Sequence, residues 1–297
     1  MSTLYIIGNG FDMWHKLPTS YGHFADFAQK LLSDIENYYS LDFNNNNPWY
    51  DFENALGAFD PEILLAEYNE IDVTADDFRP SFVYGLEDEM TEQTDAHVES
   101  IREKFAEWIQ QIDVSEAAAK IEFPEDALFI SFNYTSTLQS VYGINSNRVL
   151  HIHGNVDNHD ELIFGHGREI HDVPDVDENG DSTRDMFSDA LGNARYPLHA
   201  LKKPVDEVLA RHSQFFENLK DIETVVVIGN SLNEIDHPYF RRIADVLPDM
   251  SWHVIYYSEN ESAGFIQSLV ACGVNSERIS CAGYDYFGVE IDIEEED

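Results

Sequence analysis

The sequence is poor in basic residues. Lysine and arginine together number 17 against 57 aspartates and glutamates, which gives the 297-residue chain a formal net charge of -40. Nucleic acids and anionic membranes bind proteins through basic surface, so this balance argues against either as a direct partner. Such acidity is typical of a solvated surface, and binding of a basic protein is the alternative use.

Cysteine and long apolar runs are also scarce. The two cysteines, Cys272 and Cys281, exclude a four-cysteine zinc ribbon and disfavour a disulfide framework. No stretch reaches the roughly 20 apolar residues of a membrane span. The apolar run at residues 4–7 has no basic flank and does not form a signal peptide. The sequence therefore predicts a cytoplasmic protein.

The most informative stretch is the apolar run at residues 4–7, which is followed at once by Gly8-Asn9-Gly10-Phe11-Asp12. A strand that runs into Gly-x-Gly is typical of a phosphate-cradling turn at the start of an α/β sheet. Glycine is favoured there because the backbone turns sharply and approaches a ligand closely. The amides of such a turn would donate to a pyrophosphate. On this interpretation, Gly10→Val abolishes nucleotide binding and leaves the fold largely intact.

The middle of the chain is predicted to be helical. Residues 51–67 have the pattern of a helix that Pro61 breaks in two, and residues 85–112 that of one long helix. Strand-like apolar runs lie on either side of this segment, at residues 4–7, 128–132, 149–152, 162–164, 224–228 and 252–256 and near residue 279.

Strands that alternate with helices predict an α/β fold with a doubly wound, mostly parallel, Rossmann-like sheet. The predicted domains are a nucleotide-binding domain at residues 1–35 and 125–297 and a helical insertion at residues 36–124.

Four of the predicted strands end in small or polar residues. These ends are Gly8-Asn9-Gly10-Phe11-Asp12, Asn133-Tyr134-Thr135, His153-Gly154-Asn155, and Gly229-Asn230-Ser231 with Asp236. In a doubly wound sheet the carboxyl ends of the strands converge on one crevice, where ligands bind. One such motif is an ordinary loop in most proteins, whereas four together favour a binding site.

The same motifs carry a family resemblance. The first glycine motif with His15, Leu17-Pro18-Thr19 and Tyr21, then Phe132-Asn133-Tyr134-Thr135 and Ile152-His153-Gly154, resembles the bacteriophage abortive infection AbiH family. The coarser spacing, together with Gly229-x-Ser231-Leu232, is similar to the sirtuin-type NAD-binding fold. The resemblance implies a Rossmann-like domain with a helical insertion and NAD or a related nucleotide in the crevice.

Sirtuin-like defence proteins use an asparagine and a histidine to hydrolyse NAD, and the matching positions here are Asn133 and His153. The chain lacks the four zinc cysteines of sirtuin deacylases, and no Asp-Phe-Arg follows Pro18. The resemblance therefore favours an anti-phage effector that takes NAD as its substrate and hydrolyses the nicotinamide–ribose bond without a metal.

Each catalytic candidate has a physical role in that reaction, which passes through an oxocarbenium-like cation. His153 could deprotonate a water or a ribose hydroxyl, since the ordinary histidine pKa is about 6.5. Asn133 could hold the ribose or the water, and Asp12 could stabilise the cation. Ser231 and Asp236 could bind the second ribose. The other residues assigned to NAD binding are Gly8, Asn9, Gly10, Phe11, His15, Tyr134, Thr135, Gly154, His166, Gly229 and Asn230.

Structural roles are the alternative for the catalytic candidates. Asn133 could cap its own turn, His153 could be a hydrogen-bonded core histidine, and Asp12 could cap a helix or turn. His166 lies between two glycines, which would let its backbone approach a ligand.

Two other functions remain open. One is a non-catalytic nucleotide sensor that signals through a partner. The other is a metal-dependent phosphohydrolase or nuclease, because His151 and His153 would share one face of a strand and, with His166 and Asp157 or His159, could bind a metal. No Asp-x-His precedes them at a strand end, so the sequence favours no metal. It leaves a homo-oligomer and an activating phage-derived partner open.

Overall fold

The computed structural model describes residues 2–44, 46–171 and 174–288. These residues divide into two compact units. The sheet unit contains the residues up to Ser20, Ile109–Ile163 and those from Pro204 onward, and the helical unit contains Tyr21–Trp108 and Phe164–Lys203. The helical unit thus takes in residues 21–35 and 164–203, which the predicted domain boundaries placed with the sheet.

The sheet unit is built on six parallel strands in the order β3-β2-β1-β4-β5-β6. The strands are β1 (Ser2–Ile7), β2 (Leu128–Ser131), β3 (Val149–His151), β4 (Ile222–Ile228), β5 (Ser251–Ile255) and β6 (Ile279–Ala282). This is the strand order of a Rossmann fold, so the predicted α/β class and doubly wound sheet are confirmed. The chain order reverses between β1 and β4, and ligands of such sheets bind outside the carboxyl ends of the strands at this point.

One predicted strand is absent from the described residues, because residues 162–164 form no strand. Ile163 donates its N–H to the carbonyl of His153 and buries its side chain in the core of the sheet unit. The apolar residues at 162–164 therefore belong to a buried loop. Composition alone does not distinguish a buried loop from a strand that is hydrogen-bonded into a sheet.

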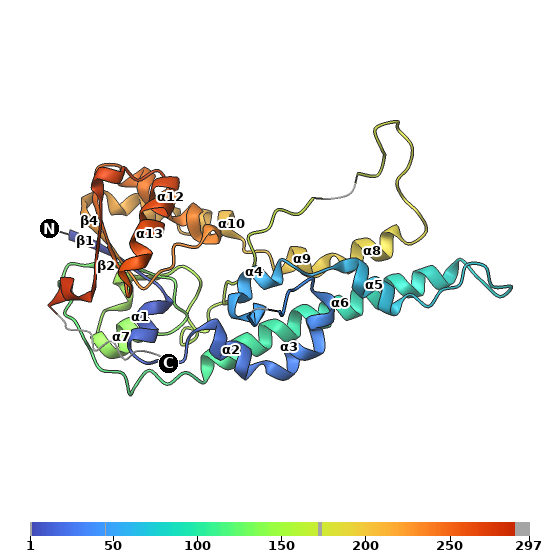
Figure 1. The fold of residues 1–297 in the computed structure, drawn as a ribbon, viewed down its shortest axis with the longest axis horizontal. Helices are drawn as coiled ribbons and strands as arrows, with labels where there is room; N and C mark the ends of the chain where they lie inside the picture. Colours follow the sequence, from blue (N-terminus) through green and yellow to red (C-terminus); the bar gives the residue numbers. More distant parts are fainter. Residues whose placement is uncertain (1, 45, 172–173, 289–297) are drawn as a thin grey trace. The chain divides into compact units, whose positions relative to one another are not determined.

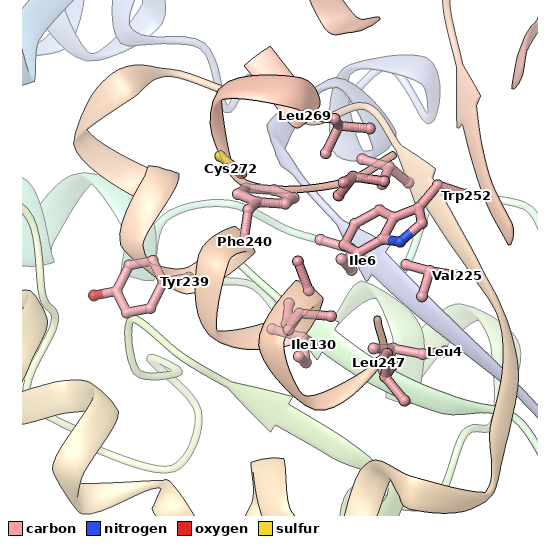
Figure 2. Packing of buried hydrophobic residues seen from close by; sticks show 14 of the residues in the cluster. Leu4, Ile6, Ile130, Val225, Tyr239, Phe240, Leu247, Trp252, Leu269 and Cys272 are labelled. Atoms are coloured by element: carbon pink, nitrogen blue, oxygen red, sulfur yellow. The ribbon is translucent and has the colours of Figure 1, made fainter. Parts of the chain in front are cut away.

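The central strands are apolar on both faces, as parallel strands covered by helices must be. Leu4 and Ile6 of β1 pack into a core that also contains Tyr239, Phe240 and Trp252 (Figure 2). The alternate side chains of β1 point to a second core on the other face, with Phe11. Helices α12 and α13 cover the first face, and α1 and α7 cover the second (Figure 1).

The helices of the sheet unit are short. They are α1 (Asn9–Trp14), α7 (Thr137–Tyr142), α10 (Val205–Arg211), α11 (Ser213–Glu217), α12 (His237–Val246) and α13 (Ser262–Ala271). Short 3-10 turns occur in both units, at Glu36–Tyr38, Pro48–Asp51, Ser146–Arg148, Asn218–Asp221, Glu234–Asp236, Glu259–Glu261, Ser276–Arg278 and Tyr284–Phe287.

The helical unit is organised around the long helix α6 (Ser81–Gln110), close to the predicted 85–112. The other helices are α2 (Tyr21–Phe27), α3 (Gln29–Ile35), α4 (Phe52–Leu56), α5 (Pro61–Tyr68), α8 (Ser188–Ala194) and α9 (Tyr196–Ala200). The predicted break at Pro61 is confirmed, since α5 begins there and the Asp60 side chain caps it. The core is aromatic: the Phe105 ring lies 5.3 Å from that of Phe24 and 4.3 Å from that of Phe164.

No helix in residues 2–44, 46–171 and 174–288 is long and apolar enough to cross a membrane.

Candidate functional site

The first glycine turn packs against the loop after β4. Gly10 donates its N–H to the Gly229 carbonyl at 2.7 Å, and Gly8 donates to Ile228 at 2.9 Å. A Cβ on Gly10 would lie 2.8 Å from the Gly229 Cα, and Gly229 has φ +63° with no room for a Cβ beside Phe11. The close approach that requires glycine is therefore between two loops of the protein.

This packing corrects the predicted phosphate cradle. The amides of Gly8, Gly10 and Phe11 all donate within the protein, the last to the Gly8 carbonyl at 2.9 Å. A nucleotide phosphate would have to use other donors. The expectation that Gly10→Val leaves the fold largely intact is also wrong, since a side chain at residue 10 collides with the backbone of Gly229.

Asp12 is the charged residue of this turn and is fully buried. Its Oδ2 accepts a hydrogen bond from the Thr135 hydroxyl at 2.5 Å, and that hydroxyl lies 3.1 Å from the hydroxyl of Thr137. Burial raises the pKa of Asp12, and the neighbouring polar groups of Thr135, Thr137 and Asn133 oppose the rise. The side chain does not cap α1, so Asp12 links the first turn to the segment after β2.

Asn133 follows β2 and is 5% exposed. Its side chain lies close enough to Asp12 to oppose the rise in the pKa of that carboxyl, but outside normal hydrogen-bond geometry. Among the described residues, neither carboxamide atom of Asn133 nor Oδ1 of Asp12 has a hydrogen-bond partner. The alternative that Asn133 caps its own turn is therefore not what the structure shows.

His153 lies in the turn after β3 and is 2% exposed. Its Nε2 is 3.7 Å from Oδ1 of Asp236, a residue that sequence reasoning assigned to the second ribose. The ring centroid lies 5.1 Å from that of Phe132, 5.5 Å from that of Tyr239 and 6.2 Å from that of Tyr134. The His153 ring thus contacts the side chains on both sides of Asn133 in the chain.

A model of the family described as bacteriophage abortive infection AbiH matches residues 4–256. The chain belongs to the AbiH family. The match contains all four strand-end motifs and shows a role in abortive infection by bacteriophage. Comparison with curated proteins and with solved structures gives no match. The grouping with sirtuin-type folds stays a prediction.

Two residues of this AbiH protein that were predicted to bind the nucleotide have side chains that already make hydrogen bonds within the protein. His15 lies 2.7 Å through Nδ1 from the Phe11 carbonyl and 2.6 Å through Nε2 from the Tyr142 hydroxyl, and burial lowers its pKa. Asn230 accepts the Leu232 N–H at 2.8 Å and so shapes the loop after β4. Either side chain would have to break a bond to hold a ligand through the same atoms.

His166 belongs to the helical unit of the AbiH chain. It is 1% exposed, its Nε2 lies 2.8 Å from the Leu198 carbonyl, and its Nδ1 accepts the Arg168 N–H at 3.2 Å. Gly165 beside it has φ +145°, and its missing Cβ makes room for the backbone of Leu201. The flanking glycine thus serves packing within the helical unit.

Gly154, Ser231 and Asn9 complete the predicted set. Gly154 has φ +83°, and a Cβ there would lie 2.4 Å from the Glu161 carbonyl oxygen, so the residue is needed to fold its loop. Ser231 and Asn9 are exposed.

The expected shared face of His151 and His153 is wrong, because β3 ends at His151 and the chain turns there. His151 contacts Gln139 of α7, whereas His153 contacts Tyr239 of α12. Among the residues that the structure describes, no group of three or more His, Cys, Asp or Glu side chains is placed to hold a metal ion.

Sequence reasoning missed a polar network beside Asn133. The ring of His151 lies 3.1 Å through Nδ1 from the Asn133 carbonyl and 2.9 Å through Nε2 from the side-chain nitrogen of Gln139. Asn155 adds contacts of 3.0 Å to the Ser136 hydroxyl and 3.3 Å to Nε2 of His151. The available signal was that His151 ends the strand next to the asparagine motif.

Proposed function

We propose that this AbiH protein binds NAD at the carboxyl ends of β1, β2 and β4 and hydrolyses its nicotinamide–ribose bond during abortive infection. The observation that carries the proposal is the buried Asn133 carboxamide, unbonded among the described residues, beside the unbonded Oδ1 of Asp12. A buried polar group without a partner costs about 1–3 kcal/mol. The protein keeps several of them together at the place where Rossmann sheets bind nucleotides.

The unbonded atoms fit the hydroxyls of a ribose. A hydroxyl donates one hydrogen bond and accepts others, so it can pair with the Asn133 carbonyl oxygen, the Asn133 amide nitrogen or the Asp12 carboxylate. Ionised Asp12 would also stabilise the positive charge that develops on the ribose as the bond breaks. The hydroxyl of Thr135 holds the other carboxylate oxygen and so orients Asp12.

In the proposed hydrolysis, the bond between ribose C1′ and the pyridinium nitrogen breaks with both electrons passing to nicotinamide, which leaves as a neutral molecule. Water oxygen bonds to C1′, and the water proton passes to Nε2 of His153. The carboxylate of Asp236, 3.7 Å away, stabilises the ring once it is protonated. The His153 ring is 2% exposed, so this role requires its covering side chains to part when NAD enters.

The test is to incubate the purified protein with NAD, with and without a chelator, and to measure nicotinamide and ADP-ribose by chromatography. We expect release that the chelator does not change and that Asn133→Ala and His153→Ala abolish. His171→Ala is the matched control, because His171 is strongly exposed in the helical unit, and it should keep the wild-type rate.

The other outcomes separate the alternatives. NAD binding without nicotinamide release, in buffer and in extract of infected cells, would favour the nucleotide sensor. Release that the chelator abolishes would favour a metal-dependent hydrolase. Release that continues in both variants would place the reaction elsewhere in the molecule.

A further inference from the structure

His151 joins the polar segment after β2 to helix α7. The residue ends β3, where it pairs in register with Ser131 of β2. Its Nδ1 lies 3.1 Å from the Asn133 carbonyl oxygen, and its Nε2 lies 2.9 Å from the side-chain nitrogen of Gln139. Each ring nitrogen therefore has its own partner.

The hydrogen bonds of Asn155 show which end of its carboxamide faces the His151 ring. Its oxygen accepts the backbone N–H of Asp157 at 2.9 Å and that of Asn158 at 3.3 Å, so the opposite end is the NH2 group. That NH2 lies 3.3 Å from Nε2 and 3.5 Å from Nδ1 of His151. Because the NH2 lies near both ring nitrogens, it does not select between them, whereas the Asn133 carbonyl beside Nδ1 can only accept and therefore makes Nε2 the unprotonated nitrogen.

The tautomer of His151 follows from these partners. With Nε2 unprotonated, the ring proton is on Nδ1, and it donates to the carbonyl of Asn133, which can only accept. Burial lowers the pKa of His151, and this outweighs the hydrogen bond to the Asn133 carbonyl and the charges of Asp160 and Asp157, so the neutral ring is favoured.

The bond from His151 fixes the peptide group of Asn133. The N–H of Asn133 already donates to the Ser131 hydroxyl at 3.2 Å, so both backbone polar groups of Asn133 are held. The next carbonyl, that of Tyr134, accepts the Val156 N–H at 3.0 Å. With the backbone held on both sides, the Asn133 carboxamide is directed to the neighbourhood of Asp12, although it makes no hydrogen bond of its own among the described residues.

We infer that His151, as its Nδ1–H tautomer, is a positioning residue that aims the Asn133 carboxamide at the ribose of the substrate. The inference rests on the proposed function for its substrate, but the tautomer and the orientation of Asn133 do not depend on that function. Gln139 supports this tautomer by donating its side-chain N–H to Nε2.

The first test is nuclear magnetic resonance of protein labelled with 15N at histidine and asparagine. The ring signals of His151 are those absent from His151→Asn, and we expect the Nδ1–H pattern at neutral pH. A ring protonated at Nε2, or at both nitrogens, overturns the inference. The side-chain amide of Asn133, identified by its absence in Asn133→Ala, should shift in His151→Leu and stay near its wild-type position in His151→Asn.

The second test is steady-state kinetics of nicotinamide release. In His151→Leu we expect kcat to fall about 10- to 100-fold with a smaller change in KM, because a misplaced group loses transition-state contacts first. His151→Asn, whose amide can donate to the same carbonyl, should recover most of the loss. The control is His253→Leu. His253 lies on β5 and contacts the Ser280 hydroxyl at 2.6 Å, and its replacement by leucine should leave kcat at the wild-type value.

The two tests separate the two proposals. If the wild-type protein releases no nicotinamide, the hydrolytic function fails, and the resonances of His151 and Asn133 still decide the positioning role. If the wild-type protein is active but His151→Leu keeps its kcat, or His151→Asn is as impaired as His151→Leu, the positioning role fails alone. Should His151→Leu not fold, the wild-type tautomer and the kinetics of His151→Asn remain decisive.

Discussion

The Thr135 hydroxyl donates a 2.5 Å hydrogen bond to the carboxylate of Asp12, although the two residues are 123 positions apart in the chain. This contact ties the first turn of the sheet to the segment that follows β2. It leaves the other carboxylate oxygen buried and, among the described residues, without a hydrogen-bond partner, beside the buried side chain of Asn133. The proposed function depends on this pair of loops.

We expect Gly10→Ala to destabilise the protein by about 1–3 kcal/mol, because the new methyl group would lie 2.8 Å from the Gly229 Cα in a closely packed region. Urea denaturation measures the change. Gly264→Ala is the matched control: Gly264 lies in α13 with no atom near its Cβ position, and alanine there should stabilise by up to about 1 kcal/mol. Equal stabilities for the two variants would contradict the loop packing described for Gly10.

Asn133→Leu should separate stability from function. Leucine has the same four side-chain heavy atoms branched at Cγ as asparagine but no polar atoms, so we expect stability to stay the same or rise by about 1 kcal/mol while nicotinamide release disappears. Asn155→Leu is the control, because the Asn155 carboxamide is hydrogen-bonded, and its loss should cost about 1–3 kcal/mol. If Asn133→Leu is as destabilised as Asn155→Leu, Asn133 has structural partners that the site described here lacks.

The raised pKa of Asp12 predicts a pH dependence with a definite sign. Burial raises the folded-state pKa above the unfolded value near about 4, so the folded protein binds the extra proton between these values. The contribution of Asp12 to stability is full below the unfolded pKa and is lost as the pH rises through the folded one.

The measurement is urea denaturation of the wild type and of Asp12→Asn over a series of pH values. Because asparagine does not titrate, the stability of the variant relative to the wild type should increase as the pH rises through that range. The other carboxylates cancel in the difference. A flat difference, or one that decreases, would show that burial does not dominate the titration of Asp12.

Lys203→Met tests the buried ion pair of the helical unit, in which Nζ of Lys203 lies 2.9 Å from Oε1 of Glu53. The same oxygen accepts the Gly165 N–H at 3.2 Å. Removing the lysine takes the positive charge at 2.9 Å away from a buried carboxylate, and we expect a loss of about 3–5 kcal/mol in calorimetric or urea unfolding. Lys104→Met removes an exposed partner of Glu107 and should cost well under 1 kcal/mol. Similar losses in both variants would contradict the burial of the pair.

The sheet could be predicted because its strands are apolar on both faces and lie between helices. The run predicted at 224–228 is most of β4, and the run at 4–7 is most of β1. The unit boundaries could not be predicted, because they depend on contacts between distant residues. Phe24 joins the helical unit through Phe105, and Phe164 joins it in the same way.

The site could be predicted only as a set of strand ends. The predicted convergence of the strand ends agrees with the effect of Asn133 on the Asp12 carboxyl, but sequence does not show on which side of a sheet a residue after a strand end will lie. The side chains of His151 and His153 point to different neighbours because β3 ends at His151 and the chain turns at residues 152–153. Nor does Gly-x-Gly show whether the backbone that comes close is a ligand or, as for Gly10 and Gly229, another loop.

The most direct test of the account is calorimetric titration of NAD into wild type, His153→Ala and Asn133→Leu proteins whose folding has been verified by denaturation. The account predicts that NAD binds to His153→Ala without being consumed and binds Asn133→Leu at least about 10-fold more weakly, as expected for loss of a buried hydrogen-bonded contact. Binding of equal strength to Asn133→Leu, or no binding to the wild type, would contradict the claim that NAD occupies the carboxyl ends of β1 and β2.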